Sequence, residues 1–256
     1  MDDSEQLADQ YLRSLSLGGV VYEPDGNIPP DFLLGSGIAG EVRRLNQNYE
    51  FADGSTQGLE QLAIPLWKRF KTFLPSLGQS VNGECWYVGL DFRRPLEEWK
   101  TLRPLVKSEL CAFMARPLRS RTTVQITPNL SLDLLRSGKD HGSFFLLGAS
   151  SDDDSGGWVM GEVERNLCFC ITEKEKKIEP YRSKYPEWWL VLADHIDYSM
   201  DKEDRPVFRA EVMPRIQHRF SKIVLIDPRD YRRAFEAYPL AAADVLRLAS
   251  PASARG

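Results

Sequence analysis

The stretch PPDFLLGSGIAGEVRRLN, residues 29–46, decides how the first part of this chain folds. Two apolar runs flank the turn sequence Gly-Ser-Gly at 35–37, so we expect a β-hairpin. Side chains alternate along a strand, which places Glu41 and Arg43 on one face of the second strand. Asp31 opens the first strand. The carboxylates of Asp31 and Glu41 are therefore expected to converge.

These two carboxylates need a positively charged partner. A carboxylate inside a strand and flanked by apolar residues is costly unless it is paired or bound to a cation. A hard divalent ion such as Mg²⁺, which one or two carboxylates and water commonly hold, would remove that cost. The sequence therefore predicts that Asp31 and Glu41 face a cation.

A second charged side chain in an apolar setting lies in residues 162–182. We expect this segment to form a helix because apolar side chains recur in it at helical spacing. The apolar stripe consists of Val163, Leu167, Cys170, Ile171, Ile178 and Tyr181. Lys174 falls in the middle of this stripe and Lys177 at its edge. A buried ammonium needs an anionic neighbour, and a helix followed by a strand packs back on the sheet, so the strand carboxylates are the expected partners. The alternative is that Lys174 extends past the stripe to water.

The remaining patterns predict an α/β protein whose mixed central sheet is flanked by helices. Helices are expected at 4–15, 57–77, 96–115 and from about 229, and strands at 19–23, 85–92, 122–126, 143–150, 188–196 and 222–227. Ser4 is the expected cap of the first helix. We assign residues 1–45 and 161–240 to one core, 46–160 to an inserted lobe, and 241–256 to the end of a C-terminal helix and a frayed tail.

Composition and charge exclude several classes of protein. With 256 residues, 42% hydrophobic and 27% charged, the chain is of the ordinary globular type. No run approaches the roughly 18 to 20 apolar residues that cross a bilayer, and the N-terminus is acidic, so we expect no membrane partner and a cytoplasmic location. The net charge of −4 does not attract polyanions as a whole. A nucleic-acid partner would therefore need a local basic patch.

The segments PPDF (29–32) and GIAGEV (37–42) resemble the motif of the PD-(D/E)XK nuclease superfamily, whose fold is called restriction-endonuclease-like. The expected order of helix, strand, Asp strand, Glu strand, helix and strand is similar to that family's core and covers residues 4–45 and 162–227. The resemblance implies an endonuclease that depends on Mg²⁺, with Mn²⁺ as a substitute, and that cuts DNA in preference to RNA.

The resemblance also implies a set of site residues. Asp31, Glu41 and the backbone carbonyl of Val42 would bind the metal, and Glu5 on the first helix is similar to an acidic residue that often joins such sites. Where the family has its lysine, this chain has Arg43, which cannot lose a proton to act as a base. Some members carry the lysine on the following helix, where Lys174 lies, with Lys177 as the second choice.

Basic side chains are the candidate contacts to nucleic acid. They are Arg43, Arg44, Arg116, Arg119 and Arg121, although the same charges are ordinary on a solvated surface. The resemblance allows a homodimer, or a larger complex that delivers the target, and a role in defence against foreign DNA. Two other functions stay open: a catalytically inactive nuclease-fold module that binds nucleic acid or protein, which Arg43 favours, and a metal hydrolase that is not a nuclease.

Overall fold

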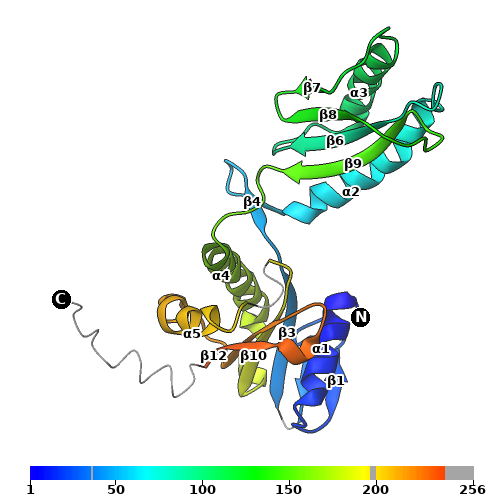
Figure 1. Ribbon diagram of the computed structural model, residues 1–256. Coiled ribbons are helices and arrows are strands. Elements are labelled where there is room, and N and C mark those ends of the chain that lie inside the picture. The colour runs from blue at the N-terminus through cyan, green and yellow to red at the C-terminus, as the bar shows by residue number, and fades with distance from the viewer. Residues whose placement is uncertain (36, 197–199, 240–256) are drawn as a thin grey trace. The chain divides into compact units, whose positions relative to one another are not determined.

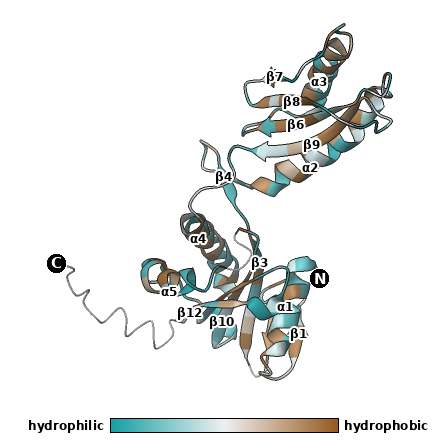
Figure 2. Ribbon diagram, viewed as in Figure 1, coloured by the Kyte–Doolittle hydropathy of each residue, from teal (hydrophilic) through white to brown (hydrophobic). Residues whose placement is uncertain are grey.

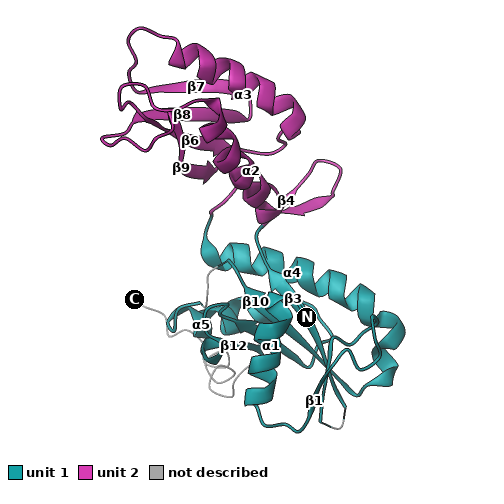
Figure 3. Cartoon of the chain, turned by 90° about the vertical axis from the view of Figure 1, so that its right-hand side faces the viewer, with its two compact units in different colours: residues 1–47, 157–256 teal, residues 48–156 magenta. Residues whose placement is uncertain are grey.

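The computed structural model describes residues 1–35, 37–196 and 200–239 (Figure 1). The chain divides into two units, residues 1–47 with 157–256 and residues 48–156 (Figure 3). The sequence predicted the inserted lobe at 46–160. Both units combine helices with β-sheets, so the protein is mixed α/β. Among the residues described, no helix has the length and apolar character needed to span a membrane.

The first unit is built on a mixed six-stranded sheet in the order β1-β2-β3-β10-β11-β12. The strands are β1 Val20–Tyr22, β2 Phe32–Leu34, β3 Ile38–Leu45, β10 Glu187–Asp194, β11 Lys222–Ile226 and β12 Phe235–Tyr238. β1, β2 and β3 pair antiparallel, β3, β10 and β11 pair parallel, and β12 returns antiparallel to β11. β3 of the early hairpin is thus hydrogen-bonded to β10, the strand that follows the late helix.

Two long helices cover opposite faces of this sheet. α1, Asp3–Ser14, packs in a core that includes Val42, and α4, Val159–Ile178, packs in a core that includes Ala39. Ala39 and Val42 point to opposite faces of β3, as the alternation of a strand requires. Both helices carry hydrophobic and hydrophilic residues (Figure 2). Because both faces are covered, β10 between them is buried over nearly its whole length.

The second unit, the lobe of residues 48–156, has a four-stranded sheet in the order β7-β8-β6-β9. Its elements are β4 Asn48–Glu50, β5 Thr56–Gly58, α2 Leu59–Phe73, a 3₁₀ turn Leu74–Leu77, β6 Trp86–Phe92, α3 Trp99–Met114, β7 Thr122–Thr127, β8 Leu130–Arg136 and β9 Phe145–Asp152. α2 and α3 share one hydrophobic core with alternate residues of β6 and β8. Both helices therefore cover the same face of this sheet.

Several elements differ from the sequence prediction. The helix expected from about 229 is wrong: a 3₁₀ turn, Tyr231–Arg233, leads into β12. Asp230 accepts a hydrogen bond from the Arg232 amide, which stabilises this turn. β12 is held by antiparallel pairing with β11, and the local sequence pattern does not reveal this pairing. Residues 200–216, which had no assignment, contain α5 Asp204–Val207 and helical turns at Phe208–Val212 and Met213–Arg215.

The helix ends differ by smaller amounts. Asp2, not Ser4, caps α1, because its side chain accepts a hydrogen bond from the amide of Glu5. The late helix begins at Val159 and ends at Ile178, and a 3₁₀ segment, Glu179–Lys184, continues it. Ser36 of the predicted hairpin turn and the tail predicted at 241–256 lie outside the described residues.

Candidate functional site

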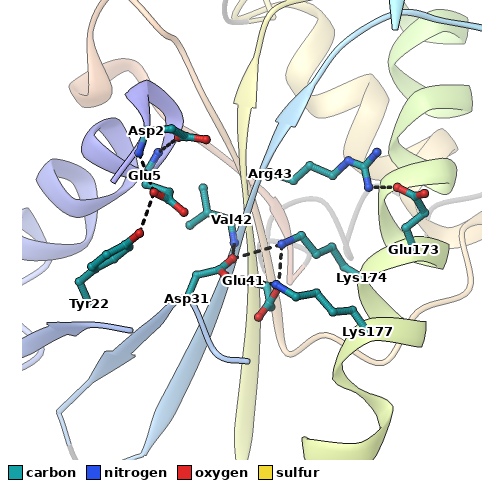
Figure 4. Close-up of polar contacts among 10 residues, drawn as sticks. All are labelled: Asp2, Glu5, Tyr22, Asp31, Glu41, Val42, Arg43, Glu173, Lys174 and Lys177. Carbon is teal, nitrogen blue, oxygen red and sulfur yellow. Dashed lines mark hydrogen bonds and ion pairs between the residues drawn. The ribbon is translucent and has the colours of Figure 1, made fainter. Parts of the chain in front are cut away.

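The hairpin of β2 and β3 brings Asp31 and Glu41 together. Phe32 pairs with Gly40, and the same register continued by one residue sets Asp31 opposite Glu41. The backbone N–H of Val42 donates to Asp31 Oδ2 at 2.8 Å, which holds the Asp31 carboxylate beside β3 (Figure 4). Glu41 has no exposed surface at all.

α4 supplies two ammonium groups to these carboxylates. Lys174 Nζ lies 2.7 Å from Glu41 Oε2 and 3.1 Å from Asp31 Oδ2. Lys177 Nζ lies 3.2 Å from Glu41 Oε2 and 3.3 Å from Asp31 Oδ1 (Figure 4). Lys174 is 8% exposed, so its charge ends in the acidic pocket and not in water. The ion pairs expected from helical spacing are thus present, and we call these four residues the acid–lysine cluster.

The two carboxyls of the cluster have pKa values displaced in opposite directions. Burial raises the pKa of Glu41 above its ordinary value, and the charge of Asp31 adds to this against the pull of Lys174. Burial also tends to raise the pKa of Asp31. The charge of Lys174, the Val42 amide and the charge of Lys177 together outweigh burial, so the pKa of Asp31 is lowered. The pKa of Lys177 is raised, because the charges of Glu41 and Asp31 outweigh its desolvation. Such divergence is common where a carboxyl pair has a chemical role.

One atom of the cluster suits a metal ion. Glu41 Oε1 is buried and has no hydrogen-bond partner, although buried polar atoms are normally satisfied. In the described ranges, no three His, Cys, Asp or Glu side chains gather as a metal site. A cation would therefore have two carboxylates, with its other positions left to backbone oxygens and water, which is a common arrangement for Mg²⁺. The donor set of Asp31 and Glu41 fits that ion.

Arg43 lies on the same face of β3 as Glu41 but contacts another part of α4. Its guanidinium pairs with Glu173 (Figure 4). Its central carbon lies 5.0 Å from the ring centroid of Phe169. Sequence reasoning missed both partners. The signal was available, since Phe169 and Glu173 lie one helical turn apart. Arg43 therefore ties β3 to α4 beside the cluster, while the exposed Arg44 donates to Asn46 Oδ1 at 2.7 Å.

Glu5 has a different place from the one predicted. It lies on α1, across the sheet from α4, and its carboxylate accepts the Asp2 amide at 2.6 Å and the Tyr22 hydroxyl at 2.9 Å (Figure 4). With Asp2 it forms a capping box, which satisfies amides at the start of the helix. Its carboxylate serves the helix end and is not part of the acid–lysine cluster.

The three predicted nucleic-acid contacts of the lobe have unlike environments. Arg119 pairs with Glu84 at 2.7 Å and also donates to the Met114 and Arg116 carbonyls, so it holds the lobe together. Arg116 is exposed, with its guanidinium 5.3 Å from the ring centroid of Phe113. Arg121 is exposed. The structure thus gives Arg119 a structural task that the sequence did not show.

Comparison of the chain with protein-family models, with curated proteins and with solved structures gives no significant match. The features of the chain that point to a function are the chemistry of the acid–lysine cluster and the elements that assemble it.

Proposed function

We propose that this protein is a metal-dependent nuclease that hydrolyses phosphodiester bonds, with DNA as the preferred substrate. The observation that carries the proposal is the position of Lys174, whose ammonium lies 2.7 Å and 3.1 Å from two carboxylates. One of those carboxylates, Glu41, keeps a buried oxygen without a partner. Two acids and a lysine around a cation are suited to phosphodiester hydrolysis.

The order of elements supports a PD-(D/E)XK type of nuclease. α1 is followed by the antiparallel strands β1, β2 and β3, and after the lobe come α4 and β10, with β10 parallel to β3. This is the order of helix, strand, Asp strand, Glu strand, helix and strand that the resemblance implies. In this proposal Lys174 on α4 takes the place of the lysine that Arg43 replaces.

Each residue of the cluster has a role in this proposal. Asp31 and Glu41 hold the metal, Mg²⁺ or Mn²⁺, which when bound polarises the phosphoryl oxygen and lowers the pKa of a water. Lys174 orients the attacking water and offsets the negative charge that develops on the phosphate. The Val42 amide keeps the Asp31 carboxylate aimed at the pocket. Lys177, whose side chain is 44% exposed, is placed to meet a substrate phosphate.

A specific observation favours a second candidate, an inactive nuclease-fold module that binds nucleic acid or protein. The two carboxylates and two ammonium groups of the cluster balance in charge and pair with each other without a metal. Such a cluster can hold α4 against the sheet as a purely structural device. Activity with added metal distinguishes the two candidates.

The test is cleavage of plasmid, single-stranded DNA and RNA by the purified chain in Mg²⁺ or Mn²⁺. We expect Lys174→Met to lower the cleavage rate at least about 100-fold, because it removes a charge that stabilises the transition state. Asp31→Ala and Glu41→Ala should abolish cleavage. Lys176→Met is the matched control, since Lys176 is exposed on the same helix, and it should cleave like the wild type.

The outcomes separate the candidates. If the wild type cleaves nothing with either metal but shifts DNA, the inactive module is correct. If Lys174→Met and Lys176→Met cleave equally well, the role given to Lys174 is wrong. Unfolding curves of each variant show whether a lost activity reflects a lost fold, and analysis of the products identifies a hydrolase of another kind.

A further inference from the structure

A groove of about 480 Å³ runs between α2 and α3 of the lobe. α2 contributes Lys68, Arg69 and Thr72 to its walls, and α3 contributes Trp99 and Arg103. The groove therefore combines three cations with a hydroxyl group and an aromatic ring. Phosphate backbones are bound by groups of these kinds.

The cations in and beside the groove have no anionic partners within the described parts of the chain. Lys68, Arg69, Lys71, Arg103 and Lys107 are all exposed, and none lies within 4.0 Å of a carboxylate. Three other basic side chains of the lobe, Arg94, Lys100 and Arg119, are paired with acids. Arg94, for example, is buried against Asp152 at 2.7 Å and against Asp154 at 3.0 Å.

The spacing of these charges does not serve the stability of the lobe. Arg103 and Lys107 are four residues apart on α3, and Lys68 and Lys71 are three apart on α2, so like charges are neighbours on each helix. Such pairs destabilise a helix slightly. A polyanion in the groove would turn this repulsion into attraction.

The groove has a firm base. Trp99 packs edge to face on Phe70 and Phe73, with ring centroids 5.1 Å and 5.5 Å apart, and these rings belong to the core of the lobe. The guanidinium of Arg103 lies 5.7 Å from the centroid of Phe73. A pre-formed surface loses less entropy on binding than a flexible basic tail would.

In the described part of the chain, the opposite face of the lobe's sheet carries two acids, Asp91 and Asp133, beside a single exposed cation, Arg121. Asp91 on β6 and Asp133 on β8 alternate with buried core residues, so they point away from α2 and α3. Burial, together with the charges of Asp133 and Asp153, raises the pKa of Asp91. The helical face of the lobe therefore attracts a polyanion more strongly than the sheet face does.

We propose that the α2–α3 groove, with Lys68, Arg69, Lys71, Arg103 and Lys107, binds the phosphate backbone of a nucleic acid. This gives a chain of net charge −4 the local basic patch that it needs for such a partner. The identity of the polyanion rests on the proposed nuclease function. The charges and the shape of the binding surface belong to the lobe alone.

The test measures binding of a short labelled DNA duplex, and of single-stranded DNA and RNA, to the full chain by fluorescence anisotropy without metal. The triple variant Lys68→Gln, Arg69→Gln and Arg103→Gln should weaken binding about tenfold and reduce the slope of log Kd against log salt by roughly 2 to 3. The matched control is the triple variant Arg93→Gln, Arg136→Gln and Lys139→Gln. It removes the same charge from exposed positions outside the groove and should stay within about twofold of the wild type.

Equal weakening by the two triple variants, or binding by the groove variant at wild-type strength, would overturn the proposal. Binding of polyglutamate without binding of any DNA or RNA would also overturn it, in favour of an acidic protein partner. The two proposals fail separately. If the wild type binds nucleic acid through the groove but cleaves nothing, only the proposed nuclease function is wrong. If the groove variant cleaves like the wild type, only the proposed role of the groove is wrong.

Discussion

Asp31 and Glu41 share the same two lysines, but they contribute to stability with opposite signs. The raised pKa of Glu41 means that the folded state favours its neutral form. Its contribution is therefore present below its unfolded pKa, about 4.3, and is lost as pH rises through the folded value. The lowered pKa of Asp31 means the reverse: its contribution is present above about pH 3.9 and is lost as pH falls through the folded value.

This difference predicts opposite effects of two isosteric substitutions. Glu41→Gln should make the protein more stable than the wild type near pH 7, with the advantage shrinking as the pH falls to about 4. Asp31→Asn should make it less stable near pH 7, with the loss shrinking as the pH falls below about 4. Urea unfolding of both variants across this range measures the two slopes.

Glu211→Gln is the control for these substitutions, since Glu211 is exposed in the same unit and should change stability little. Slopes of the same sign for Glu41→Gln and Asp31→Asn would show that the two carboxyls titrate as a symmetric pair. A higher stability of Glu41→Gln near pH 7 would mean that the wild type keeps this buried acid at a cost in stability, which is typical of functional residues.

At the scale of elements, β3 separates two helices that have different tasks. Its alternating side chains direct Glu41 and Arg43 to α4, while Val42 packs with α1. An acid on α1 would have to reach around the sheet to join the cluster. Glu5 instead completes the capping box at the N-terminus of α1.

This placement predicts that Glu5→Ala is a stability variant and not an activity variant. The loss of the capping-box hydrogen bond should lower the free energy of unfolding by about 1 kcal/mol, and cleavage should remain within about twofold of the wild type. Chemical denaturation and the plasmid assay measure the two effects. Glu5→Gln keeps the capping geometry and should recover most of the stability. If Glu5→Ala loses cleavage while its stability is unchanged, Glu5 is a residue of the metal site.

At the scale of the whole chain, the two units have separate cores. As far as the structure describes the chain, the cores on the two faces of the six-stranded sheet contain no residue of 48–156. The lobe has its own core around Phe70, Trp86 and Phe113. The chain leaves the first unit after β3 and returns to it just before α4. The acid–lysine cluster is therefore assembled from segments that precede and follow the lobe in the sequence.

Separate cores predict that residues 48–156 fold when expressed alone. We expect cooperative unfolding with a free energy of about 5 kcal/mol or more. Phe113→Ala should lower it by about 3 to 5 kcal/mol, because this ring is fully buried in the lobe core. Leu118→Ala is the control, since Leu118 is 89% exposed and should change little. Unfolding without a cooperative transition would show that the lobe depends on the first unit.

Local pattern could predict a large part of this fold. Period-2 and period-3.6 spacing indicated the hairpin at 29–46 and the late helix, and the apolar stripe singled out Lys174 as a buried charge. Local pattern failed where long-range pairing decides the structure. β12 is a strand because β11 lies beside it, and the Glu5 carboxylate is used locally because Asp2 and Tyr22 lie within reach.

The sequence by itself determined which side chains are out of place in an apolar setting, because strand and helix periods follow from backbone geometry alone. Only the tertiary structure decided which of them meet. Asp31 and Lys174 are 143 positions apart, and their contact depends on the parallel pairing of β3 with β10, which brings α4 back across the hairpin. The α2–α3 groove likewise exists only because two helices share one face of the lobe's sheet. Long-range packing is cooperative over the whole core, so no local stretch of sequence can specify it.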